Sequence, residues 1–169
     1  MIAYETKDIT STTLGVVAHG VNCQGAMGSG VALAIMRKWP EIRESYMRYK
    51  PGRHLLGSVD FVDVDPFHLL NNEERFDASG YPQPYDLVVA NCFTQEFYGG
   101  DGRKYADEEA VAKCLANVYA YADIYELPVV LPQIGCGLAG LDWEADLVPI
   151  INSLDEKFSR VDTTICLWG

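Results

Sequence analysis

The chain has 169 residues, of which 49% are hydrophobic, and this suits one domain, residues 1–169, with a sizeable core. Thirteen Lys and Arg residues against 24 Asp and Glu residues give a net charge of −11. This balance excludes a broad nucleic-acid-binding surface and attraction to an anionic membrane, so a bound anion must be held by local backbone amides.

Cysteine usage and the absence of targeting signals indicate a cytoplasmic protein. The five cysteines are scattered without a C-x-x-C pair, and the three histidines are far apart, which predicts reduced thiols and no zinc site. The N-terminus lacks the pattern of a signal peptide, and no apolar run approaches the roughly 18 residues of a membrane span.

The first elements along the chain are a strand at 1–4 and a buried strand over the apolar run 16–18. The second strand leads through a glycine loop into a helix that is expected to begin near Gly28. This helix should end at Lys38, because the residue before Pro40 is biased away from helical angles.

A second helix and a third strand follow. Pro40 suits the first helical position, and one face of that helix would carry Ile42, Ser45, Tyr46 and Tyr49. The segment 58–64 alternates apolar with acidic residues, which predicts an edge or near-edge strand with one solvent-facing side. The stretch 65–85 is too long and too rich in turn residues for an ordinary connection, and no chemistry is assigned to it.

In the second half, the apolar segment 86–93 is expected to be a central strand, followed by strands at 127–131 and 163–168. Asp142 is a plausible N-cap for the last helix, which Pro149 should kink or shorten. An earlier helix is expected from an apolar stripe formed by Val111, Cys114, Leu115, Val118 and Ala122.

Alternating strands and helices predict a three-layer α/β/α domain with a mixed or mostly parallel central sheet. Ligands in such folds lie at the carboxyl ends of the strands, where the glycine-loop segments 28–31 and 135–138 would meet. Glycines allow backbone N–H groups to approach a ligand closely, and a helix N-terminus favours binding of an anion, so phosphate is the expected ligand. The spacing Gly25-x-x-Gly28-x-Gly30 fits neither the dinucleotide-binding fingerprint nor a Walker A loop.

Several side chains near these loops are candidates for chemistry, each with a structural alternative. His19 is placed at the end of a central strand and is suited to proton transfer, or it braces the loop through a neighbouring carbonyl. Cys136 is a weaker candidate nucleophile, since packing between two glycines explains a small residue. Ser29 either binds phosphate through its hydroxyl or faces solvent, and Asp8 alone would start a turn.

Three segments in this order resemble the macro domain, an ADP-ribose-binding module. They are Lys7-Asp8-Ile9-Thr10, the glycine-containing stretch Asn22–Ala32, and Pro132-Gln-Ile-Gly-Cys-Gly-Leu138. The resemblance covers nearly the whole chain, with the exception of 65–85, and it implies the macro domain fold.

The resemblance also implies roles for individual residues. Asp8 would accept a hydrogen bond from the adenine amino group beside the Ile9 backbone, and Asn22 would bind the distal ribose and act with His19 in catalysis. The other implied ligand contacts are Met27, Gly28, Ser29, Gly30 and Val31 around the diphosphate and the 1″ substituent, Gly135, Cys136, Gly137 and Leu138 closing over it, Phe97 and Tyr98 beside the distal ribose, and Trp168 near adenine.

Within the family, the sequence looks most like the small ADP-ribose 1″-phosphate phosphatases, which implies hydrolysis of ADP-ribose 1″-phosphate to ADP-ribose and phosphate without a metal or other cofactor. The alternatives are a non-catalytic ADP-ribose-binding module and a hydrolase of ADP-ribosylated macromolecules or O-acetyl-ADP-ribose. The branch that removes ADP-ribose from macromolecules uses a lysine and often an acid at positions where this chain has Gln95 and Ala139.

Overall fold

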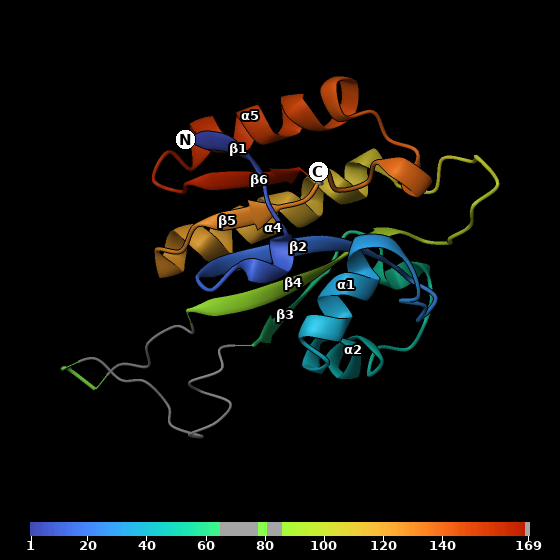
Figure 1. Ribbon diagram of the computed structural model, residues 1–169, viewed down its shortest axis with the longest axis horizontal. Coiled ribbons are helices and arrows are strands. Elements are labelled where there is room, and N and C mark those ends of the chain that lie inside the picture. The colour runs from blue at the N-terminus through green and yellow to red at the C-terminus, as the bar shows by residue number, and fades with distance from the viewer. Residues whose placement is uncertain (65–77, 81–85, 168–169) are drawn as a thin grey trace.

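Six strands form one mixed sheet in the order β1-β6-β5-β2-β4-β3 (Figure 1). The computed structural model describes residues 1–64, 78–80 and 86–167. Every neighbouring pair is parallel except β3 and β4, which are antiparallel. The strands are β1 (Ile2–Thr6), β2 (Gly15–Asn22), β3 (Val59–Asp63), β4 (Leu87–Gln95), β5 (Val129–Leu131) and β6 (Thr163–Leu167).

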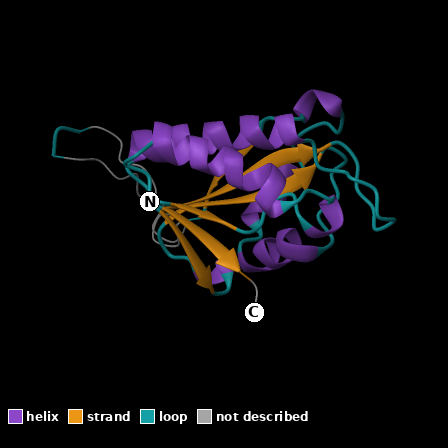
Figure 2. Ribbon diagram, turned by 90° about the horizontal axis from the view of Figure 1, so that it is seen from above, coloured by secondary structure: helices purple, strands orange, loops and turns teal. Residues whose placement is uncertain are grey.

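Helices cover both faces of this sheet (Figure 2). Helices α1 (Gly30–Lys38) and α2 (Glu41–Tyr46) pack on one face, and α4 (Glu108–Tyr125) and α5 (Val148–Lys157) pack on the other. Alternation along β2 supplies both cores, because Val17 packs with the α1 and α2 side while Val16 packs with the α4 and α5 side. The predicted three-layer architecture is confirmed.

Three expected element boundaries differ from the observed ones. Helix α1 begins at Gly30 rather than near Gly28, because Ser29 is still extended with φ −150° and ψ 164°. Pro40 is the residue before α2 rather than its first residue, and α2 ends before Tyr49. The effect expected of Pro149 is confirmed, since residues 143–147 form a π-helical turn and α5 starts at Val148, which places the proline in its first turn.

Strand β3 is the edge strand that was predicted, but its polar face is not solvated. Asp60 is only 5% exposed, whereas Phe61, expected to face the core, is half-buried and stacks on Tyr121 of α4. The expectation of a solvent-exposed acidic face is wrong at Asp60, because α2 and the turn after it cover this side of the strand. The hydroxyls of Ser45 and Tyr49 donate to the Asp60 carboxyl group at 3.0 Å each.

Two expectations concern residues outside the described part of the chain. The excursion 65–85 is described only at 78–80, and the proposed adenine-stacking Trp168 is not described. Among the described helices, none has the length and apolar character needed to span a membrane.

Core packing between α4 and the sheet predicts the effect of truncating Leu115, which is fully buried. The Leu115→Ala variant is expected to lower the free energy of unfolding by roughly 2–5 kcal/mol, because it leaves a cavity in a close-packed layer. Urea unfolding measures this change. Ile124 on the same helix is 72% exposed, so Ile124→Ala should stay within about 0.5 kcal/mol of the wild type; equal losses in the two variants would contradict the described packing.

Candidate functional site

Loops from the carboxyl ends of the parallel strands β2, β4 and β5 line one cavity of about 800 Å³. This volume lies in the range of roughly 300–1,000 Å³ typical of small-molecule sites. Most of the predicted site residues line it: His19, Asn22, Met27, Gly28, Ser29, Gly30, Val31, Tyr98, Gly135, Cys136, Gly137 and Leu138. The predicted meeting of the two glycine loops is therefore confirmed.

The first glycine loop ends at the start of α1. Gly30 has φ +60°, a conformation that L side chains rarely adopt, and a Cβ atom built on Gly28 or Gly30 would meet nothing within 4 Å. Residues 30–32 form the first turn of α1, where backbone N–H groups lack helical acceptors and the helix dipole is positive. This side of the cavity is therefore suited to binding an anion.

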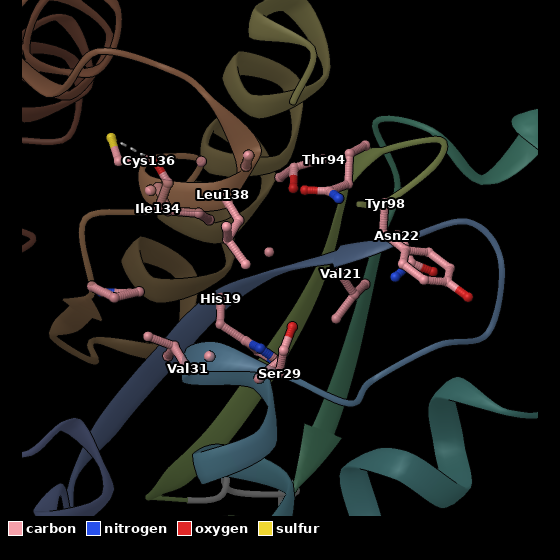
Figure 3. A pocket seen from close by; sticks show the side chains of 18 of the residues that line it. His19, Val21, Asn22, Ser29, Val31, Thr94, Tyr98, Ile134, Cys136 and Leu138 are labelled. Carbon is pink, nitrogen blue, oxygen red and sulfur yellow. Dashed lines mark hydrogen bonds between the residues drawn. The ribbon is translucent and has the colours of Figure 1, made fainter. Parts of the chain in front are cut away.

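The second glycine loop lies across the cavity from the first, and Figure 3 shows Ile134 and Leu138 opposite Ser29 and Val31. Gly137 has φ +70° and open space where a side chain would project. Leu138 is 65% exposed, so its side chain forms part of the rim. An anion between the loops would contact backbone from both sides.

Charged side chains are missing from the described lining of this cavity, which includes no Asp, Glu, Lys or Arg. The attraction for an anion must therefore come from backbone dipoles and neutral donors, in agreement with the acidic composition. The positions where the macromolecule-directed branch would carry a lysine and an acid are occupied by Gln95 and Ala139, and both line the cavity.

Asn22 braces the first loop. Its Nδ2 donates to the Ala26 carbonyl at 2.7 Å, while its Oδ1 accepts from the Gln24 amide at 2.9 Å and from the Tyr46 hydroxyl at 2.9 Å. The Asn22 side chain is 7% exposed, and Figure 3 shows Tyr98 on the same side of the cavity. These contacts give Asn22 a structural role, while its contact with a ribose stays a prediction.

His19 is buried beneath the first loop and held by Asn91. Its Nε2 lies 2.6 Å from Asn91 Oδ1, and its Nδ1 is buried without a hydrogen-bond partner among the described residues. Burial lowers the pKa of His19 from 6.5 to about 4, against the opposing effect of the Asn91 hydrogen bond. His19 is therefore neutral at pH 7, and the proton-transfer role expected of it is limited to that of an acceptor. Its contact with Asn91 also matches the bracing alternative.

Thr94 is a site residue that sequence reasoning missed. It is 1% exposed, lines the cavity, and has a hydroxyl oxygen with no hydrogen-bond partner in the described part of the chain. An unpaired buried hydroxyl is costly unless a ligand or water completes it, so Thr94 is a candidate ligand contact. Its place at the end of a central strand, immediately before a glycine-rich loop, was the available signal.

Cys136 does not have the character of a nucleophile. Burial raises the pKa of its thiol, and the charges of Asp142 and Asp146 raise it further. Figure 3 shows the sulfur turned away from His19 and Ser29, and Sγ lies 3.7 Å from the Ile134 carbonyl oxygen.

Three predicted ligand residues are not in the cavity lining. Asp8 caps a short 3-10 turn by accepting from the Thr10 amide at 2.9 Å, and Ile9 is fully buried in the core beneath α1. Phe97 is 57% exposed beside the rim. The turn-forming alternative for Asp8 is therefore observed, and adenine contact by Asp8, Ile9 or Trp168 stays a prediction.

The buried neutral His19 predicts a pH dependence of stability. The pKa of this group is about 4 in the folded chain and 6.5 for an unperturbed histidine, so between these values the unfolded chain binds more protons. Stability is then lost as pH falls from 6.5 to 4, by about 3 kcal/mol for this group. Urea unfolding from pH 7.5 to 4 should show a smaller loss for His19→Gln than for the wild type. Parallel curves would contradict the burial of a neutral histidine.

Comparisons with known proteins found similar sequences and similar structures. No family model matches the sequence. A Lodderomyces elongisporus protein named ADP-ribose 1″-phosphate phosphatase is 28% identical over 145 residues, which cover 83% of this chain and 81% of that protein. A Mycobacterium tuberculosis protein named DNA ADP-ribosyl glycohydrolase is 27% identical over 170 residues, which cover 98% of this chain but only 42% of that protein.

A solved structure of a Streptomyces coelicolor macrodomain protein has a TM-score of 0.69 and 26% sequence identity, with all of both chains covered. The chain has the macrodomain fold, and its sequence is similar to those of proteins named ADP-ribose 1″-phosphate phosphatases.

Proposed function

We propose that this protein binds ADP-ribose derivatives and hydrolyses ADP-ribose 1″-phosphate to ADP-ribose and phosphate. The observation that carries the proposal is one cavity lined by both glycine loops, at 27–31 and 135–138. A diphosphate between these loops would receive hydrogen bonds from backbone amides and the favourable dipole of α1. The names of the similar phosphatases support the choice of substrate.

Hydrolysis of the phosphate monoester requires a positioned water and a way to move its proton. Water attacks phosphorus, the P–O bond to the sugar C1″ oxygen breaks, and the proton released by water ends on the departing sugar oxygen. His19 Nδ1 is a hydrogen-bond acceptor suited to orienting this water, and Thr94 Oγ1 is a donor suited to a phosphoryl or ribose oxygen. Loop amides would stabilise the charge on the phosphoryl oxygens.

The two alternative functions use the same cavity. A non-catalytic module would bind ADP-ribose without turnover, and a macromolecule-directed hydrolase would release ADP-ribose from protein or DNA. The mycobacterial relative is named for the second kind of reaction, on DNA. The absence of a lysine from the described lining favours the phosphatase over lysine-adduct chemistry. Incubation with ADP-ribose 1″-phosphate, with ADP-ribosylated protein and with ADP-ribosylated DNA, each with and without chelator, separates the three functions.

Filling the first loop tests the proposed site directly. Gly28 has an ordinary backbone conformation and open space beyond its Cα, so Gly28→Val should fold normally while placing methyl groups at the cavity. Calorimetry is expected to show ADP-ribose affinity reduced by at least about tenfold, and phosphate release from ADP-ribose 1″-phosphate should fall with it.

The matched control is Ser153→Val, which adds a similar side chain at an exposed position of α5 away from the cavity. Thermal unfolding of both variants near the wild-type temperature establishes that they fold. Unchanged ADP-ribose affinity in a folded Gly28→Val protein would refute the placement of the ligand, whereas wild-type binding without phosphate release would refute only the phosphatase activity.

A further inference from the structure

Three polar side chains form a row across neighbouring strands behind the cavity. His19 of β2 is in register with Asn91 of β4, and Asn91 is in register with Asp60 of β3. All three are at least 95% buried. Side chains in register on adjacent strands share one face of the sheet, so the row connects the cavity with the edge strand.

The orientation of the Asn91 amide is fixed from two directions. Its Nδ2 donates to the Ile42 carbonyl at 3.1 Å and to Asp60 Oδ2 at 3.2 Å. Turning the amide by 180° would place its oxygen against these two acceptor oxygens and lose both hydrogen bonds. Such an arrangement of buried groups is costly, so Asn91 Oδ1 is held toward His19.

Asp60 is held in turn. Its Oδ1 accepts from the Ser45 and Tyr49 hydroxyls at 3.0 Å each, and this leaves Oδ2 directed at Asn91. The Ser45 hydroxyl comes from α2 and the Tyr49 hydroxyl from the turn after it, so packing of this layer against β3 sets the position of the carboxyl group.

The hydrogen bond between His19 and Asn91 then assigns the proton on the imidazole ring. Asn91 Oδ1 only accepts, so His19 Nε2, 2.6 Å away, must carry a hydrogen. A neutral imidazole has one N–H, which leaves Nδ1 with a free lone pair. Nδ1 is buried and has no partner among the described residues, and His19 lines the cavity.

We infer that Asn91, held by Asp60, is a positioning residue that fixes His19 as the Nε2–H tautomer, so that Nδ1 accepts a hydrogen bond from water or a ligand hydroxyl in the cavity. The tautomer follows from the hydrogen-bond row alone. Its effect on turnover rests on the proposed phosphatase function.

The tautomer is measured by ¹⁵N NMR of histidine-labelled protein. Replacing His54 and His68 with Gln leaves His19 as the single histidine of the 169-residue chain. The expected spectrum has a protonated Nε2 and an unprotonated Nδ1 at pH 7. A proton on Nδ1 would overturn the inference without reference to any enzymatic activity.

Variants of the row test its positioning effect. Asn91→Leu removes the acceptor and should populate the Nδ1–H tautomer, while Asp60→Asn keeps an oxygen available to Asn91 and should retain the wild-type signals. With ADP-ribose 1″-phosphate as substrate, Asn91→Leu is expected to lower kcat by at least about tenfold with KM within about twofold of the wild type.

Thr163→Val is the matched control, since it removes a buried 2.6 Å hydrogen bond to Tyr119 elsewhere in the sheet. It should alter neither the His19 signals nor kcat beyond its effect on stability. Retention of the Nε2–H tautomer in a folded Asn91→Leu protein would overturn the positioning role. If the wild type shows no turnover, the proposed function fails while the NMR result still decides the tautomer.

Discussion

Backbone geometry at the carboxyl ends of three parallel strands determines what this cavity can bind. Gly30 and Gly137 adopt positive φ values and leave open space beyond their Cα atoms, so main-chain groups can approach a ligand from both sides. With no Asp, Glu, Lys or Arg in the described lining, these dipoles must supply the attraction for an anion. The net charge of −11 is compatible with such a site because the relevant field is local.

The cavity is connected to the protein core by hydrogen bonds that fix its polar side chains. Asn22 links the first loop to Tyr46 of α2, and His19 is linked through Asn91 to Asp60. A buried polar group without a partner is costly, so each bond in these networks restricts the orientation of the next group. Among the described residues that line the cavity, His19 and Thr94 each have a buried polar atom without a hydrogen-bond partner, Nδ1 and Oγ1 respectively.

The sequence was sufficient to predict the layers and the meeting of the two loops, because strand and helix periodicity and glycine placement are local signals. It misjudged Asp60, since an acidic residue on an edge strand is usually solvated and only the packing of α2 shows why this one is buried. Asn91 was not distinguished within its apolar strand, because its role depends on register with β2 and β3.

Two further differences have the same origin in tertiary structure. Thr94 was not among the predicted ligand contacts, since its unpaired hydroxyl appears only when β4 is placed beside the cavity. The low pKa of His19 arises from complete burial, which no local sequence pattern reports. Residue type alone therefore suggested acid or base chemistry at neutral pH, whereas the folded environment leaves an acceptor.

The most direct test of this account is an NMR titration of the ¹⁵N-labelled wild-type protein with ADP-ribose, followed at the backbone amides. We expect the amides of 28–32 and 135–138 to shift together and to saturate at one equivalent of ligand. Absence of shifts, or shifts confined to the smaller cavity between the end of α4 and the start of β6, would contradict the assignment of the glycine-lined cavity as the ADP-ribose site.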